Sequence, residues 1–180
     1  MRPAQEFGFA PVTEKDRQEL LHQHIPYRVQ LFQDGAKRIP AQGKQDNQAF
    51  EAGAISGRIL LSFLGVGYDE KRDRLKEDRQ HKSMGGITDD VKVRDVGGHF
   101  VNLDSLSAHE KEALSRLIHG ANKACAHFTV GSDHRLDVAT YKQAVTIIVR
   151  LLRECLPNES KSEHIRYFGG RTGGVTLPMS

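Results

Sequence analysis

Two long amphipathic stretches in the second half of the chain constrain the fold most strongly. The first runs from Ser107 to Gly131 and the second from about Asp137 to Pro157. Projected at ~100° per residue, each gathers its apolar residues on one side, as helices that pack on a core do. The apolar stripes are Leu114, Leu117, Ile118, Ala121, Ala124, Cys125 and Phe128 in the first, and Tyr141, Ala144, Val145, Ile148, Leu151, Leu152, Cys155 and Leu156 in the second.

The boundaries of these two helices are marked in the sequence. Ser107 followed by Glu110 forms a capping-box pattern, in which each side chain satisfies a backbone N–H at the start of a helix. Asp133 or Asp137 can cap the second helix, and Pro157 ends it. The sequence therefore predicts two helices that bury their stripes against each other.

The first third of the chain predicts further helices. Thr13 followed by Asp16 is typical of a helix start, and Pro26 forces a break or a kink before a second piece over residues 27–39. Another helix is expected to begin at Asp46 or Asn47 and to run to about residue 64.

Apolar residues surround most of the 47–64 helix, which predicts a central position. Gly53 and Gly57 are four residues apart, so they allow a neighbouring helix to approach closely. Arg58 lies inside this apolar stretch, either as a side chain that extends to solvent at the edge of the bundle or as part of a site. The apolar residues on the two sides are Phe50, Ala54, Leu61 and Leu64, and Ile59 and Phe63.

A charged segment separates the two helical halves. Residues 69–90 interleave Lys and Arg with Asp and Glu, which indicates a solvated excursion. Residues 91–95 then alternate in polarity, Gly97 and Gly98 can form a tight turn, and residues 99–101 can return. The sequence predicts one small β-hairpin here, packed on the helices because a lone hairpin is barely stable.

These elements predict a mainly α fold, a four-to-five-helix bundle with one small β-hairpin insertion. We expect an irregular arm over residues 1–12, the helical domain over residues 13–157 with its charged loop and hairpin at 69–104, and a polar, glycine-rich tail over residues 158–180. A chain of 180 residues buries enough surface to fold without a metal or a disulfide. Cys125 and Cys155 fall at apolar helix positions and are expected to be small buried side chains.

The sequence favours a cytosolic protein. Residues 1–6 lack the apolar region of a secretory signal, and the most apolar stretch, residues 59–67, is too short to cross a bilayer. The net charge of +3 is mild and is not concentrated in one basic run. Such a balance permits RNA as a partner without demanding it.

Several kinds of site are excluded by spacing. The chain has no phosphate-binding glycine loop that ends in Lys-Ser or Lys-Thr, and no C-x-x-C pair. The run from His109 to Ala113 begins like a zinc-protease helix, but Ala113 stands where the second histidine ligand is required. We therefore expect neither a metal nor an organic cofactor.

One polar constellation remains on the predicted 107–131 helix. Arg116, Lys123 and His127 are spaced by seven and four residues, so they share a face opposite the apolar stripe, with His109 and Glu112 on the same side. A histidine beside fixed cations can act as a general base, and Arg and Lys can stabilise a negatively charged phosphate. These groups suit metal-independent RNA cleavage, although a charged face opposite an apolar one is also what any surface helix shows.

The segment from Ala121 to His127 resembles a degenerate form of the HEPN motif. That motif combines Arg, a polar residue such as Asn, and a later His; Asn122 and His127 match it, and Ala121 occupies the Arg position. The resemblance implies a small helical bundle, often dimeric, of the kind found in bacterial toxin–antitoxin and antiphage systems. Without the arginine fork that would orient a phosphate, Lys123 offers only a point charge.

Two functional hypotheses follow. The first is a helical, HEPN-like binding module that acts through association with a partner protein or with a second copy as a homodimer. The second is a metal-independent endoribonuclease in which His127 is the base, Lys123 or Arg116 binds phosphate, and Asn122 completes the motif.

Overall fold

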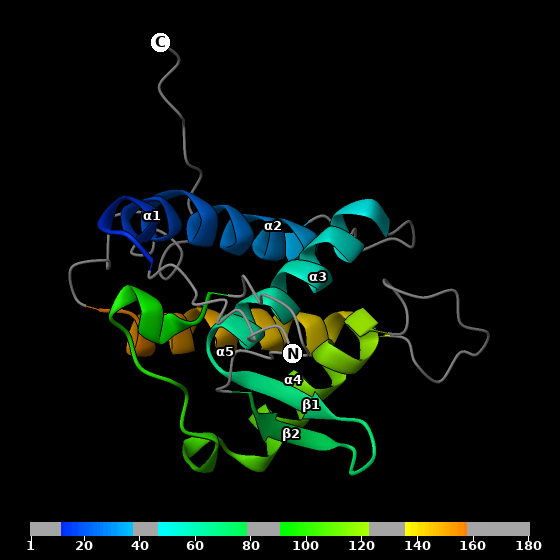
Figure 1. Cartoon of the computed structure of the whole chain (residues 1–180). Coiled ribbons are helices and arrows are strands. Elements are labelled where there is room, and N and C mark those ends of the chain that lie inside the picture. Colours follow the sequence, from blue (N-terminus) through cyan, green and yellow to red (C-terminus); the bar gives the residue numbers. More distant parts are fainter. Residues whose placement is uncertain (1–11, 38–46, 79–90, 123–135, 158–180) are drawn as a thin grey trace, which may run out of the picture.

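The computed structural model describes residues 12–37, 47–78, 91–122 and 136–157. It is a mainly helical bundle with a small two-stranded antiparallel sheet, which confirms the predicted fold class. In Figure 1, α2 lies along one side of the molecule, α3 descends from it past α5, and the hairpin forms the opposite side. No helix of the described segments is both long enough and apolar enough to span a membrane.

The first helical unit is continuous through Pro26. Helix α1 (Glu14–Glu19) begins at the predicted start, with a capping box in which the Thr13 hydroxyl and the Asp16 carboxylate each accept from the other residue's backbone N–H. A π-helical turn, η1 (Leu20–His24), then leads into α2 (Ile25–Lys37). The wider turn is a common accommodation of proline, which has no N–H to continue the regular helical bonding. Pro26 therefore distorts the helix without ending it.

Helix α3 (Asn47–Phe63) packs closely on α2, as its two glycines predicted. A Cβ atom at Gly53 would lie 3.0 Å from the Leu31 carbonyl oxygen, and one at Gly57 would lie 2.7 Å from the Phe32 ring. Neither approach leaves room for a side chain. Although α3 is central as expected, Ile59 remains 41 % exposed, so one side of the helix faces solvent.

The two late helices pack on each other as predicted. Helix α4 (Ala108–Gly120) begins at the Ser107–Glu110 capping box, and α5 (Val138–Cys155) is capped by Asp137. Within the described residues every member of the two predicted stripes is buried except Val145, which is half-buried. The part of the first stripe from Ala124 to Phe128 lies outside the described residues.

The predicted position of the hairpin is wrong. The hairpin consists of β1 (Val66–Asp69), which ends where the predicted charged loop begins, and β2 (Arg74–Glu77), which lies inside that loop. Its register pairs Tyr68 with Leu75, and both side chains pack against the core. Asp73 adopts a positive φ of 48° in the turn, a conformation that Asp tolerates better than most residues. The remainder of the charged segment, residues 79–90, lies outside the described residues.

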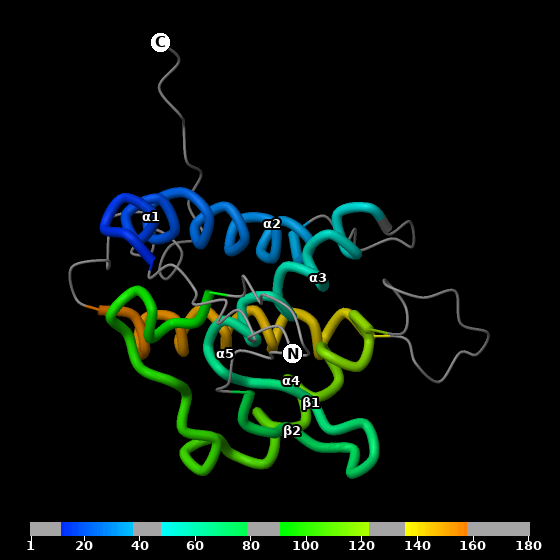
Figure 2. Tube along the Cα trace, in the orientation of Figure 1, coloured from blue at the N-terminus to red at the C-terminus, as the bar shows by residue number. Residues whose placement is uncertain are grey.

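Residues 91–101 form no strand. Val93 and Val96 belong to a 3₁₀ helix, η2 (Val93–Val96), whose three-residue spacing buries both side chains. Gly97 has a φ of 86° and ends this helix, so it serves as a helix cap and not as a hairpin turn. The backbone N–H of His99 donates to the Cys155 carbonyl at 3.0 Å. Figure 2 shows the chain passing from here through η3 (Leu103–Ser105) to α4.

The core is one continuous cluster to which all the described helices except α1 and η3 contribute buried side chains. The largest fully buried side chains are Tyr141, Phe32, Leu60, Leu61, Leu64, Leu114, Leu117, Ile148 and Leu152. Cys155 is buried among them, as expected, and burial raises the pKa of its thiol to about 11. The proposed arm (except Val12), the tail and Cys125 lie outside the described residues, so the domain boundaries stay a prediction.

Candidate functional site

The structure places two of the four predicted catalytic residues. Arg116 is exposed on α4, where its guanidinium donates to Glu112 at 2.7 Å and lies 3.9 Å from Asp137. Asn122 follows the end of α4 and is half-buried. These two residues line different cavities. Lys123 and His127 lie outside the described residues, so the ribonuclease hypothesis stays a prediction.

A cleft of about 1130 Å³ lies between the hairpin and α4. Arg116 lines it, together with acidic and basic side chains of both elements. Tyr68 forms an edge-to-face contact with His119, with ring centroids 5.7 Å apart, and its hydroxyl donates to Asp73. Burial, followed by the Asp73 hydrogen bond, raises the pKa of Tyr68 to about 12. The tyrosine is therefore a neutral hydrogen-bond donor. The cleft contains both acidic and basic side chains, so its charge favours neither an anionic nor a cationic ligand.

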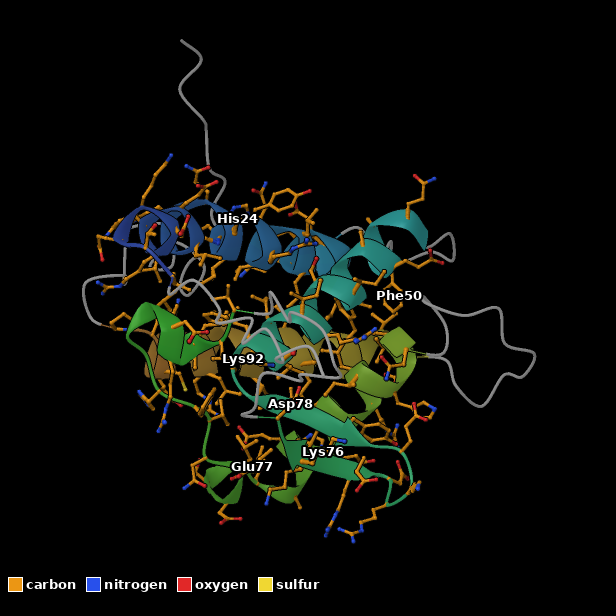
Figure 3. The ribbon with its side chains drawn as sticks, viewed as in Figure 1. His24, Phe50, Lys76, Glu77, Asp78 and Lys92 are labelled. Atoms are coloured by element: carbon orange, nitrogen blue, oxygen red, sulfur yellow. The ribbon has the colours of Figure 1, made fainter. Side chains whose placement is uncertain are left out.

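A second cavity, of about 710 Å³, has a more distinct character. We call it the cationic groove. It runs between η1 and α2, the exposed side of α3, the hairpin and the end of α4. Figure 3 shows His24, Lys92, Asp78 and Lys76 one below another along this face. The residues that line it include His24, Arg28, Ile55, Arg58, Ile59, Phe63, Lys76, Asp78, Lys92 and Asn122.

Lys92 lies at the floor of the cationic groove and is only 3 % exposed. Its ammonium donates to the Ser62 carbonyl at 2.9 Å and to the Ser62 hydroxyl at 3.0 Å, and it lies 3.5 Å from an oxygen of Asp78. The Ser62 carbonyl belongs to the last turn of α3, where a cation stabilises the negative end of the helix dipole. Lys92 therefore joins α3, the hairpin and η2, with Asp78 as its counter-ion.

This geometry argues against a nucleophilic role for Ser62. A lysine that activates a serine must accept the hydroxyl proton, and so must be neutral when it does. Here the ammonium donates to both oxygens of Ser62 and faces a carboxylate. We read the Ser62–Lys92 pair as a structural cap that holds the floor of the groove.

Three further cations line the groove without a counter-ion. Arg58 and Lys76 form no hydrogen bond or ion pair anywhere in the described structure, and Arg28 forms only a contact over the Tyr27 ring at 5.8 Å. His24 lies 3.4 Å from Glu19. Among the described residues that line the groove, the charged side chains are thus four cations and one carboxylate, Asp78. The balance favours a negatively charged ligand group.

The groove also has an apolar wall. Ile55, Ile59 and Phe63 contribute to it from α3. Ile59 and Tyr27 are the large hydrophobic side chains classed as exposed in the described part of the chain, at 41 % and 55 %. Ile59 lines the groove, and Tyr27 lies beside it under Arg28. Exposed Tyr, Ile and Arg side chains grouped in this way are typical of a surface that contacts another protein.

Asn122 adds one polar acceptor to the wall of the groove. Its side-chain oxygen is buried but has no hydrogen-bond partner in the described part of the structure. A buried acceptor without a donor is costly, and native proteins rarely leave one unpaired. The oxygen is enclosed by the protein, so a donor from a bound partner reaches it only if the wall around Asn122 shifts.

The sequence patterns identified only part of this groove. Arg58 and Asn122 were selected, the first as a charge within an apolar helix and the second from the motif. Lys92 was missed, although a lysine between two valines is a usable signal of a buried, partnered charge. Arg28 and Lys76 carry no such signal, because they come together only through the packing of α2 against α3 and the hairpin.

Comparisons with protein-family models, with curated proteins and with solved structures found no match to this chain. Among the described residues, no group of three or more His, Cys, Asp or Glu side chains is arranged to hold a metal ion.

Proposed function

We propose that this chain is a helical binding module that acts through association with another protein at the cationic groove. The observation that carries the proposal is the grouping of Arg28, Arg58 and Lys76, none of which has a counter-ion among the described residues, around the exposed Ile59. Leaving an aliphatic side chain in water beside uncompensated cations stabilises nothing in the isolated chain. Both features are accommodated when a partner covers the face.

The resemblance of residues 121–127 to the HEPN motif gives this proposal a biological setting. Modules of that kind occur in bacterial toxin–antitoxin and antiphage systems, so we propose a cytosolic defence role of this type. A homodimer is one form that the association can take, since many such bundles are dimeric. RNA binding belongs to the alternative hypothesis, which rests on His127.

Site-specific photocrosslinking tests the association. A benzoylphenylalanine at position 59 is compared in cells with one at position 146, where Thr146 is exposed on α5 and does not line the groove. We expect a discrete adduct only from position 59, and its loss when Arg28→Glu and Arg58→Glu are added. An adduct of twice the mass of the chain would identify a homodimer.

Equal adducts from both positions, or an adduct that survives the charge reversal, would refute association through the groove. The endoribonuclease alternative is tested separately with total RNA in EDTA. Cleavage by the unmodified protein that is absent with His127→Ala would establish the enzyme. No cleavage, or the same cleavage by both proteins, would exclude it.

A further inference from the structure

Resting on the proposed association function, we infer that the partner presents an acidic, amphipathic peptide segment to the cationic groove. Such a segment combines Asp or Glu side chains with aliphatic ones. The inference specifies the chemistry of the partner, and three separate properties of the groove support it.

The first property is charge. Arg28 from α2, Arg58 from α3 and Lys76 from the hairpin belong to three different elements, so their positive charges are spread along the groove. Carboxylates spaced along a peptide can meet each of them in turn. Arg28 and Arg58 can bind a carboxylate through two parallel hydrogen bonds, which makes the pairing directional.

The second property is the apolar wall. Ile55 and Ile59 are four residues apart on α3, and Phe63 is four residues further, so the three form one stripe along the helix. Aliphatic side chains of a partner would bury the exposed part of Ile59 against this stripe. The pattern matches a partner with acidic residues on one side and apolar residues on the other.

The third property is the unpartnered oxygen of Asn122. A peptide supplies N–H groups along its whole length, and one of them would satisfy this enclosed oxygen if the wall around Asn122 shifts on binding. A partner segment thus meets the cations, the aliphatic stripe and the acceptor together.

A nucleic acid fits the same groove less well. Its phosphates would meet Arg28, Arg58 and Lys76 as peptide carboxylates would, so charge alone does not separate the two partners. Base recognition in single strands depends on exposed aromatic rings or guanidinium planes for stacking. Arg28 and Arg58 offer such planes, but the exposed wall beside Arg58 is Ile59, and Phe63 is only 8 % exposed. The aliphatic wall favours a peptide over RNA.

Selection from a phage-displayed library of random 16-residue peptides tests the inference without presupposing a sequence. The full chain is the bait, and the matched baits are Arg28→Glu with Arg58→Glu, and Lys15→Glu with Lys142→Glu. The second pair makes the same change of net charge at exposed residues outside the groove. We expect enriched peptides that combine Asp or Glu with Leu, Ile, Val or Met.

Binding of a synthetic enriched peptide is then measured by fluorescence anisotropy. We expect the groove double variant to weaken binding by at least about tenfold, and the matched double variant by less than about threefold. Asn122→Leu should weaken it several-fold. Ile59→Ser should also weaken it, and a peptide with its aliphatic residues replaced by Ser should bind poorly.

Other outcomes overturn the inference in identifiable ways. Enriched peptides that are neutral or basic, or that bind all three baits equally, would refute it. Poly(U) RNA that binds more tightly than any peptide and loses affinity with Arg28→Glu and Arg58→Glu would replace the peptide by a nucleic acid. A photocrosslinked adduct from position 59, combined with a peptide selection that enriches no acidic peptides, would support association at the groove. It would refute only the inference that the partner segment is acidic.

Discussion

The hydroxyl of Tyr141 donates a hydrogen bond of 2.7 Å to the backbone carbonyl of Phe32, which joins α5 to α2 through the centre of the bundle. The two rings also meet edge to face, with centroids 5.1 Å apart. Tyr141 is completely buried, so its hydroxyl needs a partner inside the protein. Gly35 and Gly53 provide the space, because a Cβ at either position would collide with this hydroxyl.

Substituting Gly53 tests this arrangement. In Gly53→Ala the new methyl group would lie 2.1 Å from the Tyr141 hydroxyl oxygen, so we expect a loss of about 1–3 kcal/mol in the free energy of unfolding. The loss should be smaller in a Tyr141→Phe background, where the colliding oxygen is absent. Urea denaturation of the four proteins of the double-mutant cycle measures the difference. Equal losses in both backgrounds would show that the clash lies elsewhere.

Truncation in the α5 stripe tests the core. Ile148 is fully buried, so Ile148→Ala should destabilise the protein by about 2–5 kcal/mol through lost apolar burial and the cavity left behind. Thr146→Ala, at an exposed position of the same helix, is the control and should change stability by less than about 0.5 kcal/mol. A loss at position 148 as small as that of the control would contradict the packing of α5.

Removing the Lys92 ammonium should loosen the junction of α3, the hairpin and η2. Lys92→Met keeps the aliphatic stem but leaves the Ser62 oxygens and Asp78 without their donor, so we expect a loss of about 2 kcal/mol. Adding Asp78→Asn should recover part of the loss by removing the unpaired charge. Denaturant melts check both expectations, with the exposed Lys142→Met as control. An unchanged Lys92→Met melt would show that the cap contributes nothing.

The cap of α4 should make a pH-dependent contribution to the free energy of unfolding. Hydrogen bonds from the backbone and side chain of Ser107, followed by the charge of Arg150, lower the pKa of Glu110 below its ordinary value of 4.5. A lowered carboxyl pKa in the folded state stabilises the protein above pH 4.5, and that contribution disappears as the pH falls through the folded-state pKa.

Ser107→Ala removes the side-chain part of this cap. We expect a loss of about 1 kcal/mol at pH 7. The loss should shrink as the pH falls through the lowered folded-state pKa of Glu110, because the carboxyl group then becomes protonated in both proteins. Thermal melts between pH 3 and pH 7 measure the difference. A difference that stays constant over this range would mean that Glu110 takes no part in the cap.

The Cys155 thiol should be unreactive in the folded protein. Burial raises its pKa to about 11, so almost none of it is thiolate at pH 8, and reagents must also reach a buried atom. In a Cys125→Ser background, we expect no reaction with a disulfide reagent in buffer and complete reaction of one thiol in denaturant. Labelling of the native protein within minutes would place Cys155 at the surface.

Local patterns predicted the helices of this protein well. The helix start at Thr13, the Ser107 capping box, Asp137 as one of two candidate caps and the stripe of α5 were all identified from residues within a few turns of one another. Helix caps and amphipathic faces are recorded in short stretches of sequence, because the hydrogen bonds and the side-chain periodicity that define them are local. Gly53 likewise predicted the close packing of α3 on α2.

Local patterns misplaced the hairpin for the same reason. The alternation at residues 91–95 was genuine, but a strand needs a partner, and Val93 and Val96 instead bury themselves in a 3₁₀ turn. The pair that does form, Tyr68 with Leu75, joins the residue just before the charged segment to one inside it, and these side chains find a core only in the folded protein. Strand pairing depends on which surfaces lie nearby.

The sequence by itself determined the helical class, the helix starts and the apolar faces, since each follows from interactions between residues close in the chain. Only the tertiary structure decided that Lys92 is buried beneath Ser62 and that cations from α2, α3 and the hairpin meet around Ile59. Burial of a charge and the convergence of distant side chains depend on contacts between residues far apart in sequence. The periodicity of a short stretch of sequence carries no information about such contacts.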